Sequence, residues 1–372
     1  MFSKKSGDPD YIYYNGNIIP DLENTQHQYG QIIFNDSLID NLIDNADKYA
    51  FAIDRVQFDA SLLPVWIPLL DTVINDGRTT VYTINIHMES SSLTASYATP
   101  IIYNNDDYII YHASSPNDYF NNPYYWINSM QRFVDLLNTT ITACFNDVKA
   151  QIISIGGTFT SACPFVLFDS TTELFTVYFD ATSLPDGTGE QLTMTFNNHL
   201  QLLLRHFNYK QVNPQDATNS IGYQFTPFNN YGKNTYTYNA INYVYVTQEN
   251  KSIEYFSPVS SIVFSSDQLP IVGDIITSNA KTITDSLYAL SSIGAQERII
   301  TDIVVGMNSL YDYKQIITYI PTQYRWISMV GADVKKINLS VYWRNKYNAL
   351  LYPVYISPIG FCSFKFVFKK RI

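Results

Sequence analysis

The sequence predicts an antiparallel, all-β scaffold that carries one helix-containing insertion. Two segments near the C-terminus, 337–343 and 361–369, alternate apolar and polar residues, which is the period of half-buried antiparallel strands. Shorter runs of the same kind recur along the chain between turns rich in Asn, Gly and Pro. One long segment, 124–152, instead spaces its apolar residues by about 3.6, as in a helix that lies on a sheet.

Residues 1–20 are predicted to form an N-terminal arm with a hairpin turn at Asn15–Gly16. Apolar residues in such an arm would be a liability in a free monomer; they are Phe2, Tyr11, Ile12, Tyr13, Tyr14, Ile18 and Ile19. We expect the arm to dock on a neighbouring subunit by adding a strand to an open sheet edge. The alternative is that the arm folds back onto its own chain.

Four strands are expected between the arm and the long helix. Segment 48–58 is the first. Its large apolar residues stand at odd positions up to Ile53 and at even positions from Val56 onward, and such a one-residue shift indicates a β-bulge or a bend between sheets. Segment 81–88 alternates regularly, and 101–103 and 108–112 are two shorter strands.

The helix at 124–152 can be capped by Asn122, with Pro123 at its first position. Its apolar stripe requires a sheet to cover it. A hairpin is expected next, with strands at 165–168 and 174–179 joined by a polar turn.

The second half of the chain begins with a short helix at 197–207, capped by Asn197 or Asn198. Segment 208–239 is rich in Tyr, Asn, Gln, Pro and Gly, which is typical of a functional loop or an interaction surface. Strands are expected at 241–247 and 262–264, and an extended loop or flap at 273–312.

The composition is low in charge and high in aromatic residues. Charged residues make up 15% of the 372 residues, with 31 Tyr and 22 Phe, whereas soluble proteins average about 25% charged residues. Tyrosine is enriched on surfaces that become covered by partners, although an AT-rich coding genome would give the same bias. The net charge of −10 argues against a general nucleic-acid-binding surface.

The sequence contains no motif for a catalytic, cofactor or metal site. It lacks a nucleophile elbow, a phosphate loop, a calcium loop and the histidine pairs of zinc enzymes. Three cysteines without paired spacing, Cys144, Cys163 and Cys362, favour neither disulfides nor zinc. We also expect no signal peptide and no transmembrane segment. A non-enzymatic protein without a small-molecule substrate is therefore expected.

Aromatic side chains from 223 to 238 form the main candidate binding segment. Such residues can stack on sugars, clamp a neighbouring subunit or cover the protein's own core. Candidates for subunit or receptor contact are Tyr11, Tyr13, Tyr14, Tyr223, Phe228, Tyr231, Tyr236 and Tyr238.

Both ends of the chain resemble a known family in their layout. The segments concerned are 49–58 with 62–67, then 324–327, 337–343, 352–356 and 364–370. Their order is similar to that in penton-type minor capsid proteins of polinton- and virophage-like double-stranded DNA viruses. The resemblance implies a jelly roll, in some members with an inserted upper domain, and five copies at each icosahedral vertex. It carries over no catalytic or ligand residue.

We therefore expect an all-β fold: an antiparallel jelly roll (a Greek-key sandwich) with an inserted α+β subdomain. The expected parts are the arm at 1–20, the jelly-roll base at 21–112 and 240–372, and the insertion with its long amphipathic helix at 113–239.

The expected function is that of a structural virion protein, a penton-type minor capsid subunit. The partners implied are its own copies, as a pentamer, and the major capsid protein. The basic residues near the termini, such as Lys4 and Lys369, could contact the genome or an internal membrane. The expected location is the virion, after synthesis in the host cytoplasm or a viral factory. A viral spike or another glycan- or receptor-binding β-protein is the alternative, and a β-rich glycoside hydrolase is a third class.

Overall fold

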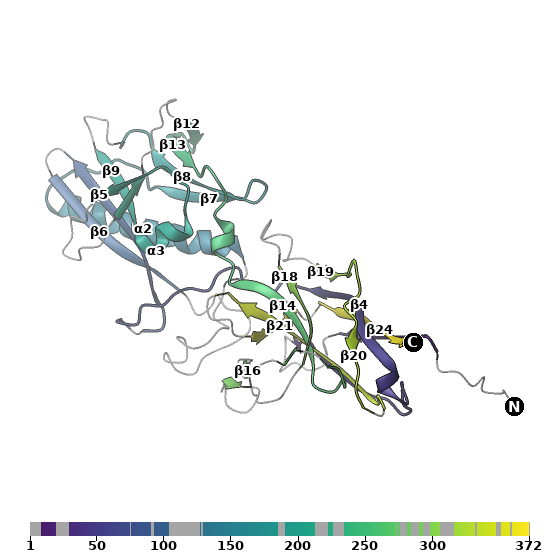
Figure 1. Ribbon diagram of the computed structural model, residues 1–372. Coiled ribbons are helices and arrows are strands. Elements are labelled where there is room, and N and C mark those ends of the chain that lie inside the picture. The colour runs from purple at the N-terminus through teal and green to yellow at the C-terminus, as the bar shows by residue number, and fades with distance from the viewer. Residues whose placement is uncertain are drawn as a thin grey trace. The chain divides into compact units, whose positions relative to one another are not determined.

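The computed structural model describes residues 9–19, 30–74, 76–90, 93–103, 127, 129–184, 190–212, 222–225, 234–272, 274–275, 281–283, 290–292, 298–305, 316–331, 333–346, 351–357 and 359–371. The chain divides into two compact units: unit 1 is Met1–Pro64 with Pro258–Ile372, and unit 2 is Val65–Ser257 (Figure 1). The insertion is thus longer at both ends than the predicted 113–239. The expected strand at 108–112 lies outside the described residues.

Unit 1 is built from two main antiparallel sheets. The β24 sheet has the order β1-β24-β4-β19, with β20 also paired to β4, and the β21 sheet has the order β15-β18-β14-β21-β22, with β3 also paired to β21. Two further pairs are β2–β23 and β16–β17. The strands are β1 (Tyr11–Ile18), β2 (Gly30–Gln31), β3 (Ile33–Ser37), β4 (Tyr49–Asp59), β14 (Val259–Ser266), β15 (Asp274–Ile275), β16 (Lys281–Ile283), β17 (Leu290–Ser292), β18 (Arg298–Val304), β19 (Ile316–Tyr319), β20 (Ile327–Ser328), β21 (Lys336–Asn345), β22 (Leu351–Pro353), β23 (Tyr355–Ile356) and β24 (Cys362–Lys370).

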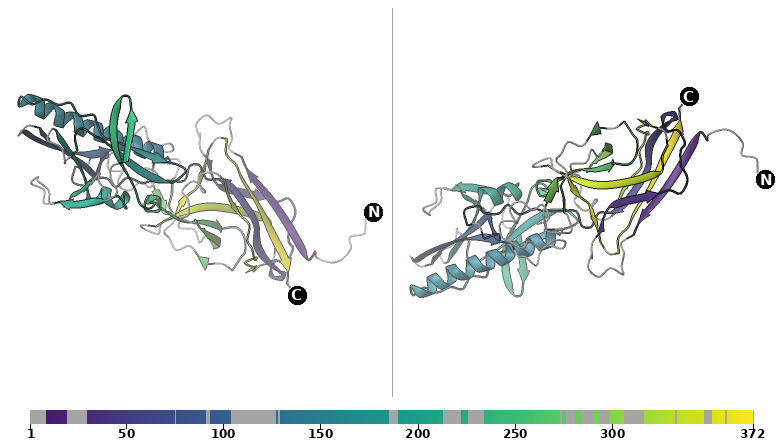
Figure 2. Two further views of the ribbon diagram at one scale, coloured as in Figure 1. Left: turned by 90° about the horizontal axis from the view of Figure 1, so that it is seen from above. Right: turned by 90° about the horizontal axis from the view of Figure 1, so that it is seen from below.

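The two sheets face each other across an aromatic core. The ring centroids of Phe58 on β4 and Phe264 on β14 lie 6.4 Å apart. Those of Phe34 on β3 and Phe364 on β24 lie 4.8 Å apart. Each contact therefore joins the β24 sheet to the β21 sheet. In Figure 2, β1, β24 and β4 run side by side as one layer. Strands distant in sequence are therefore neighbours, as a Greek-key arrangement requires, and unit 1 is an antiparallel sandwich of the jelly-roll type.

The first strand corrects the prediction of a separate arm. Residues Tyr11–Ile18 form the continuous strand β1, paired antiparallel with β24 of the same chain. Asn15–Gly16 lies inside this strand and not in a hairpin turn. The reason is packing: Gly16 faces Phe364, and a Cβ at Gly16 would lie 2.1 Å from the nearest ring atom. A glycine in a strand often marks such a close approach.

Replacing Gly16 with valine is expected to loosen β1 from the sandwich. The new side chain would overlap the ring of Phe364, and overpacking of this kind costs about 1–3 kcal/mol. Hydrogen exchange of the β1 amides should therefore accelerate. The matched control is Asn17→Val, because Asn17 is the exposed next residue of the strand. Equal protection of β1 in both variants would contradict this packing account.

The bulge predicted within 48–58 is confirmed. On β24 the pairing passes from Lys365, opposite Arg55, directly to Phe366, opposite Ile53, so Asp54 is the extra residue of β4. Segment 273–312, expected as a loop, instead contains several strands. Its longest is β18, which pairs with β14 on the β21 sheet; weak alternation in the sequence concealed it.

Unit 2 also contains two antiparallel sheets. The β5 sheet has the order β10-β11-β9-β5-β6, and the β8 sheet has the order β12-β13-β8-β7. The strands are β5 (Thr79–Ser90), β6 (Leu93–Ile102), β7 (Phe165–Asp169), β8 (Leu174–Asp180), β9 (Gln191–Asn197), β10 (Tyr209–Val212), β11 (Gly222–Phe225), β12 (Asn234–Tyr238) and β13 (Ile241–Thr247). β5 and β6, which the sequence assigns to the base, belong here because β5 pairs with β9.

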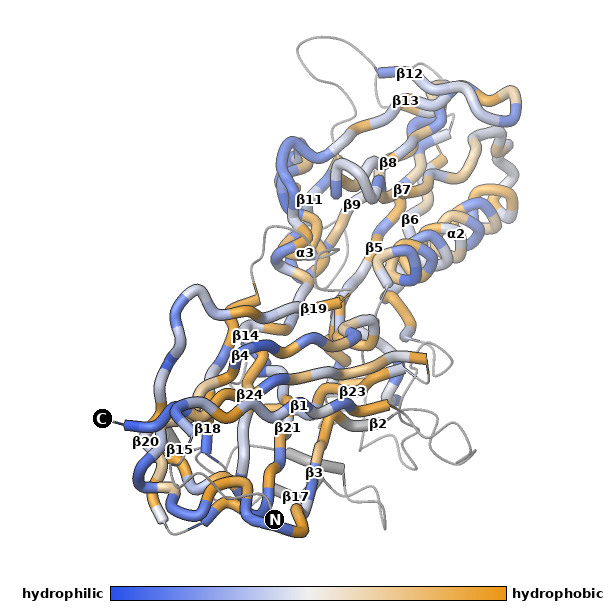
Figure 3. Tube along the Cα trace, turned by 90° about the vertical axis from the view of Figure 1, so that its right-hand side faces the viewer, coloured by the Kyte–Doolittle hydropathy of each residue, from blue (hydrophilic) through white to orange (hydrophobic). Residues whose placement is uncertain are grey.

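The long helix α2 (Met130–Ser154) packs against β5, β6 and β7. In Figure 3 hydrophobic and hydrophilic stretches alternate within the turns of the α2 tube, as expected for a helix with an apolar stripe on one side. The helix begins six residues later than predicted. Ile127 forms a β-bridge with Trp66 and cannot join the helix, so Ser129 takes the N-cap position. The short helix α3 (Asn198–Leu203) begins as predicted, and the side chain of Asn197 accepts a hydrogen bond from the Leu200 amide, 3.1 Å.

Candidate interaction surfaces

The outer side of the β24 sheet carries lysines held against aromatic rings. The ammonium of Lys365 lies 4.5 Å from the ring centre of Tyr13. That of Lys369 lies 5.9 Å from the ring centre of Tyr11 and 5.6 Å from that of Trp326. Such cation–π contacts fix the position of a flexible lysine. We call this surface the lysine–aromatic face; it comprises Tyr11, Tyr13, Asp54, Arg55, Tyr324, Trp326, Lys365 and Lys369.

One carboxylate, Asp54, belongs to this face. It pairs with Lys365 at 3.1 Å and accepts a hydrogen bond from the hydroxyl of Tyr324. Burial alone would raise the pKa of Asp54, but the hydrogen bonds from Tyr324 and Lys365 lower that pKa below its ordinary value. The same hydrogen bond raises the pKa of Tyr324 to about 12. Asp54 therefore stays ionised near neutral pH and partly neutralises Lys365.

The structure separates the three tyrosines predicted near the N-terminus. Tyr11 and Tyr13 are about half exposed on the lysine–aromatic face. Tyr14 points to the opposite side, where it packs against Phe34 and donates a hydrogen bond to Asp36, 2.5 Å. Tyr14 is thus part of the core lining, and the contact hypothesis applies only to the first two.

The partners of these tyrosines could not be found from sequence. Tyr324 and Trp326 lie some three hundred residues away along the chain, in the irregular segment just before β20. The alternation of β24 was the one available signal, because it placed Lys365 and Lys369 together on the polar side.

A second surface lies on the outer side of the β8 sheet. The ring of Tyr178 stacks on Phe165, with centroids 4.7 Å apart, and lies 5.5 Å from each of Tyr245 and Tyr236. The rings of Tyr236 and Tyr238 are stacked, with centroids 6.4 Å apart. We call these five residues the tyrosine face. Burial raises the pKa of Tyr178, and its neighbours Tyr236 and Tyr245 add to this effect, so the phenol of Tyr178 remains a neutral donor and acceptor.

The predicted aromatic segment 223–238 therefore does not form a single site. Tyr236 and Tyr238 lie on the edge strand β12 of the β8 sheet, whereas Tyr223 lies on β11 of the β5 sheet, with its hydroxyl 3.4 Å from Asn198. Phe228 and Tyr231 lie outside the described residues.

Exposed aliphatic side chains mark a third surface, at β19. This strand is the last in the order of the β24 sheet among the described residues. Ile316 is 45% exposed, and Ile320, just beyond the strand, is 64% exposed. An edge strand with exposed apolar side chains is a ready surface for association.

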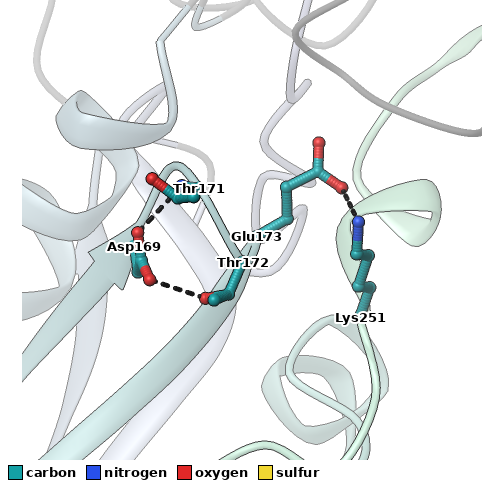
Figure 4. A network of polar contacts seen from close by, with 5 residues as sticks. All are labelled: Asp169, Thr171, Thr172, Glu173 and Lys251. Atoms are coloured by element: carbon teal, nitrogen blue, oxygen red, sulfur yellow. Dashed lines mark hydrogen bonds and ion pairs between the residues drawn. The ribbon is translucent and has the colours of Figure 1, made fainter.

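Two neighbouring polar contacts in unit 2 have a structural explanation. In Figure 4, Asp169 accepts hydrogen bonds from Thr171 and Thr172 at 2.8 Å and so closes the predicted hairpin turn between β7 and β8. Buried Glu173 pairs with Lys251 at 2.7 Å and ties this turn to the segment after β13. Such a pair needs no catalytic role.

The described residues contain no cluster of three or more side chains that could hold a metal ion. The cysteines in that part of the chain are unpaired thiols, and Cys144 donates to the Tyr97 carbonyl. No described helix is long and apolar enough to cross a membrane.

Comparison with known proteins gives consistent relationships. The chain is 23% identical over 164 residues to "Uncharacterized protein V18" of Sputnik virophage, a match covering 40% of this chain and 90% of that protein. It shares its fold with a chain of the Sputnik virophage particle solved by cryo-EM (21% identity, TM-score 0.72, 98% of each chain). It also shares its fold with the mavirus penton protein in a crystal structure (13% identity, TM-score 0.62, 98% of this chain and 100% of that one).

The match to a protein family is nearly complete. The family described as Sputnik minor capsid protein V18/19 matches residues 12–370, a range that includes both sheets of unit 1 except Tyr11, the first residue of β1, and the whole insertion. The protein therefore belongs to the Sputnik minor capsid protein V18/19 family.

Proposed function

We propose that this minor capsid protein is the penton subunit of its virion. Five copies would close each icosahedral vertex, and the ring would also contact the major capsid protein. The proposal rests chiefly on the family match across residues 12–370, together with a fold shared with the mavirus penton protein along 98% of the chain.

The surface of unit 1 supports a role in assembly. Its exposed aliphatic residues would be costly on a free protein, and they include Ile19, Ile39, Val304, Ile320 and Ile359. Only 15% of the residues are charged. Depletion of charge together with exposed apolar and aromatic area is typical of surfaces that partners cover.

The remaining parts of the proposal concern location and chemistry. The subunit would act structurally, without catalysing a reaction, after synthesis in the host cytoplasm or a viral factory. The basic C-terminal strand, with Lys365 and Lys369 on its outer side, would face the genome or an internal membrane.

The mass of the purified protein in solution tests the proposed ring. A pentamer of the 42.6 kDa chain has a mass of about 213 kDa, five times the mass of one copy. Light scattering after size exclusion, at several protein concentrations, should find this species. A trimer would contradict the proposal and favour a spike.

The tyrosine face favours a second function, binding of glycans on a host surface. Five aromatic rings from four strands lie together there, and Tyr236 and Tyr238 are 43% and 51% exposed. Neutral rings with hydroxyl groups can stack on the apolar faces of sugars while they hydrogen-bond to the edges.

Glycan-array binding by the wild type is the expected result for this second function. The double variant Tyr236→Ala/Tyr238→Ala should lose at least tenfold in affinity, since each aromatic contact contributes about 1 kcal/mol. Tyr223→Ala is the matched control, because Tyr223 is a tyrosine of the other sheet. Equal loss in both variants would exclude the tyrosine face as the site.

A further inference from the structure

The lysine–aromatic face differs in charge from the rest of the protein. The chain as a whole has 33 acidic and 23 basic residues, which gives a net charge of −10. On this face the cations Arg55, Lys365 and Lys369 stand against the single carboxylate Asp54, a balance of +2. A local excess of cations on an acidic protein is the electrostatic pattern of a site for an anionic partner.

The lysines are also held in place. Arg55 lies directly opposite Lys365 across the β4–β24 pairing. Lys369 lies between the rings of Tyr11 and Trp326, and in the described part of the chain no carboxylate is paired with it. Ring contacts orient an ammonium without neutralising its charge. Both lysines are therefore presented as fixed cations on a rigid sheet.

We propose that the lysine–aromatic face binds the phosphate backbone of nucleic acid without sequence preference. This inference deepens the genome contact included in the proposed function and assigns it to particular residues. The aromatic rings serve to position the lysines rather than to stack on bases, since Tyr11, Tyr13 and Trp326 each already have a lysine over the ring.

The spacing of the cations suits a polyanion. Lys365 and Lys369 are four residues apart on one strand, so their Cα atoms are separated by about 14 Å. Duplex DNA presents about eight phosphate charges over that length. If about three cations engage phosphates, the affinity should fall about 40-fold between about 50 mM and about 200 mM salt.

A lipid surface fits the face less well. Binding at a membrane interface requires apolar side chains that insert between headgroups. On this side of β24 the aliphatic residue between the two lysines, Val367, is only 1% exposed, and the exposed rings are engaged by ammonium groups. Binding to anionic lipid instead of DNA is therefore the alternative outcome that the experiment tests.

The test measures binding of the full-length protein to a short fluorescein-labelled DNA duplex by fluorescence anisotropy. Lys365→Glu/Lys369→Glu should weaken binding at least tenfold at low salt, because two attractive charges become repulsive. Lys149→Glu is the matched control, since Lys149 also lies over an aromatic ring, Phe159 at 5.8 Å, but in unit 2. Its affinity should stay within about twofold of the wild type.

A gain-of-affinity variant guards against misfolding as an explanation. Asp54→Asn removes the one negative charge of the face, while its side-chain oxygen can still accept the hydrogen bond from Tyr324. Binding should become about threefold tighter. The same measurement with single-stranded DNA shows whether the face prefers the duplex or the single-stranded backbone. Phosphatidylserine vesicles test binding to anionic lipid.

Several outcomes would overturn the inference: no binding of the wild type to either DNA form at low salt, unchanged binding by the double lysine variant, or binding to vesicles alone. The oligomeric mass is measured on the same samples. A pentamer that does not bind DNA overturns only this inference, whereas a monomer that binds DNA overturns only the proposed ring.

Discussion

Replacing Phe133 with alanine is expected to lower the free energy of unfolding of unit 2 by about 3–5 kcal/mol. Phe133 is fully buried and lies at the centre of an aromatic cluster. Its ring is 4.9 Å from each of Trp66 and Phe256 and 6.2 Å from Phe175. These partners come from segments before and after the helix, so the cavity would loosen several elements at once.

Urea unfolding combined with hydrogen exchange measures this effect. The amides of α2, β5 and β8 should lose protection together in Phe133→Ala. Ile153→Ala is the matched control on the same helix, because Ile153 is 53% exposed, and it should change the stability by no more than about 0.5 kcal/mol. Similar stability of the two variants would show that the aromatic cluster does not hold unit 2 together.

The double variant Ile316→Lys/Ile320→Lys is expected to abolish assembly while leaving the fold intact. Both side chains are exposed at the edge strand β19, so the single chain loses little packing. In a ring of five copies, however, the two new lysines of each copy would place ten positive charges in or beside the contacts between copies. Like charges at such contacts repel strongly. The oligomer should dissociate to the 42.6 kDa monomer.

Size exclusion with light scattering records this result, and circular dichroism confirms that the sheets are retained. The matched control is Ile153→Lys/Ile155→Lys, which adds the same charges at two positions of unit 2 that are 53% and 51% exposed. A pentamer that persists in the β19 variant would exclude this edge from the subunit contact.

The sequence predicted those features of the fold that depend on local patterns. The bulge in β4 was detectable because one extra residue reverses the alternation at Asp54. The start of α3 was detectable because an asparagine caps it at Asn197. The strand β1 was misjudged because Asn15–Gly16 is a strong local turn signal, whereas a distant ring, Phe364, requires the glycine in a strand.

Features that depend on pairing between distant strands could not be predicted. Alternation shows that β5 and β6 are half-buried strands, but it does not tell which sheet they join, and pairing with β9 places them in unit 2. The tyrosine face was missed for the same reason. Phe165, Tyr178 and Tyr245 meet only because β7, β8 and β13 are neighbours, and nothing in the spacing of these residues reveals it.

Locating this chain in the virus particle tests the central claim most directly. An icosahedral cryo-EM reconstruction of particles labelled with an antibody fragment against unit 2 would show where the protein lies. The proposed function predicts five copies around each five-fold vertex, with density for the jelly-roll unit in the ring. Density in protruding trimers, or between capsomers away from the five-fold axes, would contradict it.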